Sequence, residues 1–409
     1  MGEPLTEPAD GRASGPTDRG GTAAWREVLA VFLRLGLTAF GGPAAHTGLF
    51  RETVVRRHGW IDDPDFMDLV AATSVIPGPN SSELALAIGR RRAGWPGFFA
   101  AGAGFILPAV VISVVLAWLA VGAATAETVA AVLVGIDPVI IAILIVSVLG
   151  LGRTMAGDGA RLMVAAIAAI AYLAGLPEVG ILVAGAAVVA GWRFSHERRP
   201  GAAGPGDSKA VGALIAAGGS MATAATTAAI GLLPIFLVFL KAGALLFGSG
   251  YVLVALLRAD LVQGLGWITE RQLLDAIAVG QATPGPLTST AGYIGFLLAG
   301  LPGALVASIG IFLPAFVLVA FLEPIVRAVR SNSLAAAALG GAGAAALGLM
   351  AGVTIELAAL TLVPGGILVV VPLAVAVGAT IALASGRVGP TVLIIIGGLI
   401  GLARVVVVG

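Results

Sequence analysis

Cysteine is absent from this chain of 409 residues, and histidine and charge are scarce. Without cysteine the protein can form no disulfide, has no thiol nucleophile and offers no thiolate to a metal. The three histidines, His46, His58 and His196, lie scattered without the spacing of a metal site, so we expect no metal and no cofactor. The sequence also lacks the GxxxxGK[ST] pattern of an ATP-binding loop, which excludes direct ATP hydrolysis.

Charged residues make up only 11% of the chain and hydrophobic residues 58%, whereas a soluble domain carries about 25% charged residues. Four runs contain no Asp, Glu, Lys or Arg: Ala93–Ala126, Ala276–Leu322, Ser331–Ile355 and Leu357–Gly386. A membrane-spanning helix needs roughly 20 mainly apolar residues. The runs are apolar on all faces rather than alternating, as the strands of a barrel would be. The sequence therefore predicts an all-α polytopic protein embedded in a lipid bilayer.

The chain repeats itself about halfway along. The segment FLRLGLTAFGGP, which starts at Phe32, returns as FLKAGALLFGSG from Phe239, 207 residues later. The same offset relates further matches in order: Arg51 to Arg258, Gly59 to Gly266, Asp68 to Asp275, and Pro77-Gly78-Pro79 to Pro284-Gly285-Pro286. So many ordered matches indicate a tandem duplication of one structural unit.

The duplication sets the expected boundaries. We predict a disordered tail over residues 1–24, a first transporter repeat over 25–194, a polar linker over 195–209 and a second repeat over 210–409. The tail is rich in Gly, Pro and charge and lacks the apolar core of a signal peptide. Each repeat is expected to hold five or six membrane segments.

Each repeat is interrupted twice by residues that break helices. One break is the Pro-Gly-Pro motif, and the other is Gly-rich, at Gly41-Gly42-Pro43 and again at Gly248-Ser249-Gly250. In lipid, non-helical backbone survives only where protein or a water-filled cavity satisfies its polar groups. Matching interruptions in two repeats are the sequence pointer to a transporter binding site. The alternative is that these glycines and prolines serve close helix packing or kinks.

The residues after the breaks favour an anionic ligand. A new helix start presents free N–H groups and the positive end of the helix dipole. The residues that follow the two Pro-Gly-Pro motifs and carry hydroxyl or amide groups are Asn80, Ser81, Ser82, Thr288, Ser289 and Thr290. We predict that they bind substrate together with the residues of the breaks. His46 is a further candidate donor, although a packed neutral histidine is the commoner role.

A pair of matched cations gives a second reason to expect an anionic ligand. Arg34 lies in the apolar segment before the first Gly-rich break, and Lys241 occupies the matching place in the second repeat. A cation at the centre of a span costs at least about 2.5 kcal/mol, so we expect both to face the ligand. Cations, hydroxyls and helix starts together suit a tetrahedral oxyanion. The alternative is that both side chains extend toward an interface.

The remaining charged residues are candidates for coupling or gating. Asp68 and Asp275 match across the repeat and are expected to pair with Arg51 and Arg258, with a proton relay as the alternative. Glu83 follows the first Pro-Gly-Pro motif and either carries a coupling proton or forms a salt bridge with Arg90 or Arg91. Asp137 is an acid inside an apolar run, for which function is the default interpretation.

Arginines flank the first Pro-Gly-Pro motif on both sides, with Arg51, Arg56 and Arg57 before it and 90–92 after it. The positive-inside rule favours both clusters on the cytoplasmic side. A re-entrant hairpin turning at the motif satisfies this rule, and it favours repeats of opposite orientation. In the alternative, the segment crosses fully and one cluster faces outward.

These motifs resemble those of the chromate transporter family in its long, two-domain form. The resemblance rests on FLRLGLTAFGGPAAH, IPGPNSS and FILPA, mirrored by FLKAGALLFGSG, TPGPLTST and FLPA, and it covers nearly the whole chain from Phe32. It implies a bacterial inner-membrane protein that exports chromate and confers resistance. The second repeat departs from the first at Gly250, Leu253 and Leu287, which stand for Pro43, His46 and Asn80.

The leading hypothesis is a secondary oxyanion transporter working by alternating access, with chromate first and sulfate or another oxyanion next. A cation or amino-acid carrier is a nearer rival, but it predicts acidic groups at the breaks. A membrane enzyme needs a nucleophile with a base, or a metal cluster, at helical spacing, and neither is present in the sequence. A purely structural scaffold would not need duplicated breaks. We expect no nucleic-acid partner, and a homodimer stays open.

Overall fold

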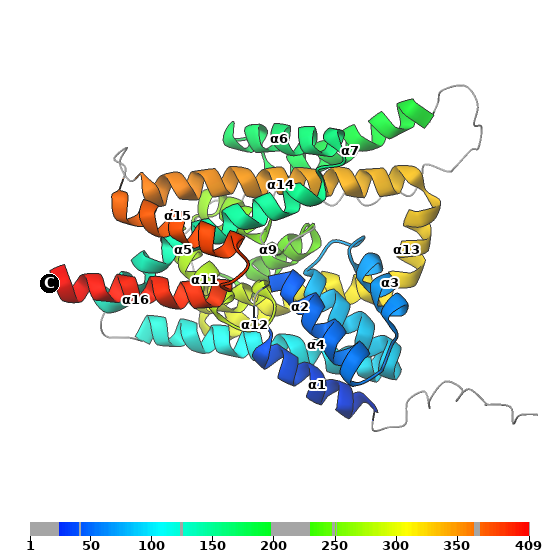
Figure 1. Cartoon of the computed structure of the whole chain (residues 1–409), viewed down its shortest axis with the longest axis horizontal. Coiled ribbons are helices and arrows are strands. Elements are labelled where there is room, and N and C mark those ends of the chain that lie inside the picture. The colour runs from blue at the N-terminus through cyan, green and yellow to red at the C-terminus, as the bar shows by residue number, and fades with distance from the viewer. Residues whose placement is uncertain are drawn as a thin grey trace, which may run out of the picture.

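The computed structural model describes residues 24–40, 42–122, 126–197, 230–247, 250, 252–363 and 369–408. Within these ranges every regular element is a helix, and no strand occurs (Figure 1). Five helical stretches are long and apolar enough to cross a membrane: Asn80–Val121, Gly135–Thr154, Glu178–Ser195, Leu287–Ala320 and Ser333–Leu362. The protein is an all-α, multi-pass membrane protein, as its charge-free runs predicted.

The two halves share one order of elements, and in the described residues the second half has two additional short helices, η3 and α13. The first half comprises α1 (Ala24–Thr38), α2 (Gly42–Phe50), η1 (Arg51–Arg57), α3 (Asp63–Thr73), α4 (Asn80–Gly122), α5 (Ala126–Thr154), α6 (Gly159–Leu173) and α7 (Glu178–Glu197). The second comprises α9 (Leu232–Ala244), α10 (Val252–Leu257), η2 (Arg258–Gly264), α11 (Glu270–Ala282), η3 (Leu287–Ser289), α12 (Thr290–Ala320), α13 (Leu322–Ser331), α14 (Ser333–Leu362), α15 (Val370–Ala384) and α16 (Pro390–Val408). Both η1 and η2 are π-helices, and they begin at the matched arginines.

Local signals at matched positions start the helices before each Pro-Gly-Pro motif. Asp62 caps α3 by accepting the N–H of Asp65 at 2.8 Å. Its counterpart Thr269 caps α11 in a capping box with Gln272. Such caps satisfy N–H groups that a helix start leaves without partners, and each contributes about 1 kcal/mol. The duplication therefore extends to the chemistry that fixes where these helices begin.

Helix α4 turns back on itself at Ala93 and Gly94. Their dihedral angles are not helical, and Gly94 has φ of 60°, which favours glycine. A Cβ added to Gly89 would lie 2.3 Å from the carbonyl oxygen of Gly97, although eight residues of straight helix span about 12 Å. Residues 80–92 and 95–122 are therefore two limbs packed side by side. Helix α12 turns in the same way at Ala299 and Gly300.

The first limb of α4 and α3 form a hairpin whose tip is the Pro-Gly-Pro motif. Arg91, near the outer end of that limb, pairs with Asp65 at the start of α3. Arg92 pairs at 3.0 Å with Glu27, near the start of α1, and Glu27 also accepts a hydrogen bond from Trp60. The two arginine clusters thus lie at the same end of the hairpin. This is the arrangement that the re-entrant prediction requires.

Glycines allow the first helix of each repeat to pack closely on the helix that follows the hairpin. A Cβ on Gly36 of α1 would lie 2.5 Å from the Gly104 carbonyl oxygen of α4. A Cβ on Gly243 of α9 would likewise lie 2.3 Å from the Ile311 carbonyl oxygen of α12. Alanine fits neither place, so backbone meets backbone at both contacts.

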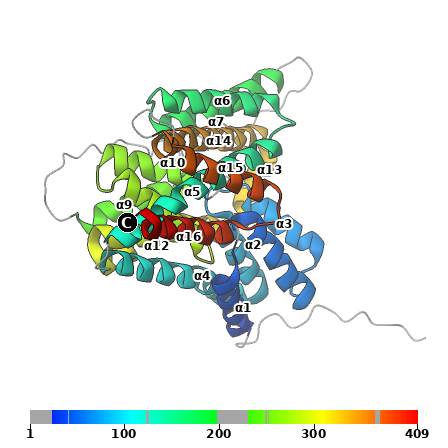
Figure 2. The same cartoon turned by 60° about the vertical axis from the view of Figure 1, so that its left-hand side comes forward.

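The two halves interlock rather than lie apart. Figures 1 and 2 both show α14, from the second half, alongside α6 and α7 of the first. Gly348 of α14 approaches the Ala165 carbonyl of α6, and Gly397 of α16 approaches Gly135 of α5. Each half therefore completes the packing of the other.

The predicted boundaries need small adjustments where the structure describes them. Ala24, placed in the tail, begins α1, and Ser195 to Glu197, placed in the linker, end α7. The rest of the predicted tail and linker, 1–23 and 198–209, and the first part of the second repeat, 210–229, lie outside the described residues.

Candidate functional site

Each Pro-Gly-Pro turn donates a backbone hydrogen bond to the other repeat. The N–H of Gly78 donates to the Leu246 carbonyl oxygen at 2.6 Å, and the N–H of Gly285 donates to the Ala39 carbonyl oxygen at 2.9 Å. Leu246 is the repeat counterpart of Ala39. Because the flanking prolines carry no N–H, the glycine supplies the only donor within each motif. Two breaks far apart in the sequence therefore meet at one place, related by an approximate two-fold exchange of the repeats.

A small cavity of about 30 Å³ lies where the turns meet. That is room for about two water molecules. Both halves line it, and the lining residues are Gly42, Pro43, His46, Pro79, Asn80, Ser81, Gly250, Gly280, Gln281, Thr283, Gly285, Pro286, Leu287 and Thr288. Described residues of the Gly-rich breaks and of the Pro-Gly-Pro motifs thus line one cavity. The predicted binding site depends on such a meeting of the breaks from both repeats.

His46 is both packed and part of the cavity wall. Its Nε2 lies 3.1 Å from the Ala39 carbonyl oxygen and its Nδ1 lies 2.9 Å from the Ser81 hydroxyl. Since a carbonyl only accepts, the proton is assigned to Nε2, and Ser81 then donates to Nδ1. The ring also packs edge-on against Phe105 at 5.5 Å. In this arrangement His46 holds the Ser81 hydroxyl in place. It also links Ser81 to the Ala39 carbonyl, which accepts the hydrogen bond from the Gly285 N–H.

Two hydrogen-bond donors in the cavity wall lack partners. Gln281 Nε2 and Thr288 Oγ1 are buried and have no hydrogen bond within the described part of the chain. Leaving a buried donor unsatisfied costs about 1–3 kcal/mol. Such groups in a shared cavity point to a ligand or water that accepts hydrogen bonds.

The sequence analysis missed four residues that line the cavity around the second Pro-Gly-Pro motif. Gly280, Gln281 and Thr283 precede the motif and Leu287 follows it, whereas the prediction took the motif itself and the residues after it that carry hydroxyl or amide groups. The signal was present in QATPGPLTST, whose polar Gln281 and Thr283 interrupt an apolar run. Their first-repeat counterparts Ser74 and Ile76 do not line the cavity, so the repeat could not reveal them.

Several predicted site residues lie next to the cavity without lining it. They are Pro77, Gly78, Ser82, Pro284, Ser289 and Thr290. Ser289 Oγ lies 3.3 Å from the Ser113 hydroxyl, and the Thr290 hydroxyl donates to the Leu287 carbonyl at 2.6 Å. Gly41, Gly248 and Ser249 lie outside the described residues.

The structure does not bring the predicted cations to the cavity. Helix α1 buries Val28, Phe32, Leu35 and Gly36, a stripe at helical spacing, and Arg34 is exposed between these positions. Lys241 is also exposed and pairs with Asp260 of η2. Both lie outside the set of lining residues. The cavity walls described here are therefore neutral.

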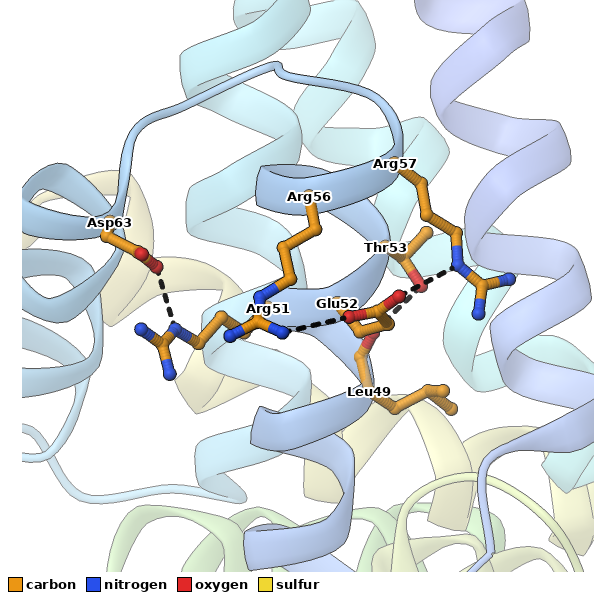
Figure 3. A network of polar contacts seen from close by, with 7 residues as sticks. All are labelled: Leu49, Arg51, Glu52, Thr53, Arg56, Arg57 and Asp63. Atoms are coloured by element: carbon orange, nitrogen blue, oxygen red, sulfur yellow. Dashed lines mark hydrogen bonds and ion pairs between the residues drawn. The ribbon is translucent and has the colours of Figure 1, made fainter.

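The predicted pairing of Arg51 with Asp68 is wrong. Arg51 Nε bonds to Asp63 Oδ1 at 2.7 Å (Figure 3), and the Arg51 guanidinium lowers the pKa of that carboxyl. Asp68 is exposed on α3. Five residues of helix turn about 140° away from Asp63, so only Asp63 faces Arg51.

The predicted pairing of Arg258 with Asp275 is wrong in the same way. Arg258 bonds to Glu270, the counterpart of Asp63, at 2.7 Å, and also to Glu356 of α14 and the Tyr172 hydroxyl of α6. Asp275 instead pairs with Arg271 at 3.2 Å. Arg271 also lies 3.5 Å from Asp137 of α5. Asp137 thus lies in a charged cluster between the halves rather than at the cavity.

The suggested salt bridges of Glu83 are also wrong. Arg91 pairs with Asp65, and Arg90 donates to carbonyls at the end of α12 and lies over the Trp95 ring at 4.3 Å. Glu83 is fully buried, and neither carboxylate oxygen has a hydrogen-bond partner among the described residues.

Comparison with known proteins identifies the family. The chromate transporter family matches residues 26–192 and 233–402, one match in each half. The chain belongs to the chromate transporter family. It is 31% identical to the chromate transport protein of Cupriavidus metallidurans over 322 residues, 78% of this chain and 79% of that protein. The probable chromate transport protein of Synechococcus elongatus is 31% identical over 303 residues, 73% and 76% of the two chains. The chromate transport protein of Pseudomonas aeruginosa is 31% identical over 322 residues, 78% and 77%.

Chromate transporter family members are transport proteins, so this chain is a transport protein and not an enzyme. One family match falls in each of the two repeats found in the sequence. No solved structure matches the chain.

Proposed function

We propose that this protein is a secondary transporter that exports chromate across the bacterial inner membrane, and that the cavity between the two Pro-Gly-Pro turns is its substrate site. The proposal rests on two donors, Gln281 Nε2 and Thr288 Oγ1, which have no hydrogen-bond partner in the described part of the chain and lie in a wall built from both repeats. The curated relatives described as chromate transport proteins support the choice of substrate.

The composition of the wall favours an anion over a cation. Amide and hydroxyl donors line it, and none of its lining residues is an Asp or Glu. A carrier of divalent metal cations would need oxygen ligands, several of them carboxylates. Neutral donors also suit transport, because a substrate bound too tightly would not leave. Sulfate shares the tetrahedral shape of chromate, so it is the natural competitor to test.

The repeats are proposed to lie in opposite orientations. Phe98, at the start of the second limb of α4, packs against Phe316, near the end of α12, with ring centroids 5.5 Å apart. Farther along that limb of α4, a Cβ added to Gly292 would lie 3.3 Å from Val110 and 3.2 Å from Ser308, which precedes Phe316 in the second limb of α12. These contacts support equivalent helices running antiparallel, which is the geometry of inverted repeats.

The small cavity, of about 30 Å³, supports alternating access. We propose that the turns separate to admit an oxyanion, which must reach the donors on both walls with its four oxygens. The Gly78–Leu246 and Gly285–Ala39 hydrogen bonds link the repeats at this point. We propose that rocking of one repeat against the other opens the cavity to one side of the membrane and then to the other.

The test is uptake of labelled chromate into everted membrane vesicles. Thr288→Val and Gln281→Leu should each reduce uptake about tenfold or more, since each removes a donor to the anion. Thr380→Val is a matched control, because Thr380 bonds only within α15. Arg34→Gln and Lys241→Gln should keep most of the uptake. Normal uptake by both cavity variants would contradict the site, and uptake of sulfate but not chromate would change the substrate.

A further inference from the structure

Glu83 is the one buried carboxyl that directly adjoins a Pro-Gly-Pro turn in the described part of the chain. It lies four residues after Pro79, whose carbonyl accepts the Glu83 N–H at 3.2 Å. It therefore shares a helix face with the end of the turn. A Cβ added to Gly78 would lie 2.0 Å from Glu83 Oε1, so the carboxyl rests against the backbone of the turn.

Among the described residues, no cation pairs with the Glu83 carboxyl. The charged or titratable groups on α4 and on the elements packed against it are Arg26, Glu27 and Arg34 on α1, His46 on α2, Asp63, Asp65 and Asp68 on α3, Arg90, Arg91 and Arg92 on α4, Glu270, Arg271 and Asp275 on α11, and Tyr293 on α12. Glu27 pairs with Arg92, Asp63 with Arg51, Asp65 with Arg91 and Glu270 with Arg258. Arg26 and Arg34 are exposed, and Arg90 donates to carbonyls at the end of α12. His46 is bound to Ser81 and Ala39, Asp275 is paired with Arg271, and Asp68 is exposed. The Glu83 carboxyl is fully buried, and among the described residues neither of its oxygens accepts a hydrogen bond. An ionised carboxylate without a partner in such a place is costly, whereas the protonated acid is not.

We infer that Glu83 carries a proton whenever the cavity holds the oxyanion, so that one proton travels with each anion. The inference rests on the proposed function. An ionised Glu83 would repel a dianion held in the cavity that Asn80, one helical turn before Glu83, helps to line, and protonation removes that repulsion. The proton binds to a Glu83 oxygen from the side on which the anion enters and leaves to water on the other side. No other bond forms or breaks.

The repeat supports a single proton for each cycle. The counterpart of Glu83 is Thr290, whose hydroxyl is already bound to the Leu287 carbonyl. The second Pro-Gly-Pro turn thus has no acid in the matching place. A dianion moving with one proton carries one net negative charge, and an interior-negative membrane potential then favours its exit.

The experiment measures chromate binding by the purified full-length protein in lipid nanodiscs as the pH is raised. The variants are Glu83→Gln, which keeps the size of the side chain, and Glu83→Thr, which places there the residue of the second repeat. The control is Glu52→Gln, since Glu52 pairs with Arg56 and Arg57 at an exposed surface. Chromate itself takes up a proton in mild acid. Because the two Glu83 variants lack the carboxyl, the pH dependence of their chromate affinity measures the effect of chromate protonation alone.

The native protein and Glu52→Gln should lose chromate affinity by up to about tenfold for each pH unit above the titration of Glu83. Both Glu83 variants should bind chromate with only the pH dependence of the ligand. In proteoliposomes, a chromate gradient should move protons through the native protein, as reported by an entrapped pH dye, and should move none through either variant.

Equal pH dependence in the native protein and the Glu83 variants would overturn the inference and point to His46 instead. Loss of chromate binding at every pH in folded variants would also overturn it, because a neutral side chain is predicted to suffice. If Glu83→Gln fails to fold, Glu83→Thr carries the test. Failure of the native protein to bind chromate at any pH would contradict the proposed function rather than the role of Glu83.

Discussion

At the scale of single residues, the site depends on two glycines whose conformation side chains rarely adopt. Gly78 has φ of 151° and Gly285 has φ of 94°. A Cβ at Gly78 would meet the Glu83 carboxyl, and a Cβ at Gly285 would lie 2.8 Å from the Ala109 side chain. A larger residue at either position would therefore have a strained backbone, and its Cβ would clash with neighbouring atoms.

Gly78→Ala and Gly285→Ala should each destabilise the protein by about 1–3 kcal/mol and abolish chromate uptake. Gly48 offers the control, because it lies in α2 with open space around its Cα. Gly48→Ala should be neutral or slightly stabilising. The measurements are the thermal unfolding midpoint in detergent and uptake into vesicles. A Gly78→Ala protein with native midpoint and uptake would show that the turn is not constrained as described.

The residue scale also shows where sequence reasoning reached its limit. The breaks, the residues after them and their convergence followed from helix chemistry and the repeat. The direction of Arg34 did not, because α1 exposes Leu33 and Leu37 as well as burying apolar residues. A helix that meets lipid on one side and protein on the other is apolar on both. Periodicity then cannot reveal which face is inward, and Arg34 was predicted to face the ligand because a cation in lipid is costly.

At the scale of elements, the two repeats contain a matching ion pair, but its burial and its further partners differ between them. Arg51 and Asp63 join η1 to α3 at an exposed surface, with side chains 41% and 49% exposed. Arg258 and Glu270 join η2 to α11, but Arg258 is 7% exposed and also binds Glu356 of α14. The second pair has become a tie between three helices. The sequence predicted that both arginines matter, but partners on α14 could only be found in three dimensions.

Arg258→Ala should lower the stability of the protein by about 2 kcal/mol or more, because it leaves two carboxylates near each other without their cation. Arg51→Ala, the matched variant, should lower the stability much less than Arg258→Ala, since the Arg51–Asp63 pair is solvated. The lowered pKa of Asp63 means that the Arg51 contribution is present at neutral pH and is lost in acid as Asp63 takes up a proton. Thermal unfolding of both variants decides the matter. Equal losses would mean that burial does not distinguish the two pairs.

At the scale of the whole molecule, the absence of cysteine makes orientation measurable. Arg56 and Gln263 occupy matched, exposed places in η1 and η2. In single-cysteine variants, a membrane-impermeant maleimide should label Arg56→Cys and Gln263→Cys from opposite sides of the membrane. Arg91→Cys should be labelled from the same side as Arg56→Cys, because α3 and the first limb of α4 form a hairpin. Labelling of Arg56→Cys and Gln263→Cys from the same side would contradict the inverted orientation.

The exchanged hydrogen bonds, Gly78 to Leu246 and Gly285 to Ala39, have a consequence for how such a molecule is made. Neither repeat can finish its own turn, so the first repeat to leave the ribosome must wait, with an open peptide donor inside the bilayer, for the second. The cavity can therefore form only after the second repeat has been synthesised. The two repeats, expressed as separate polypeptides, should associate through these hydrogen bonds.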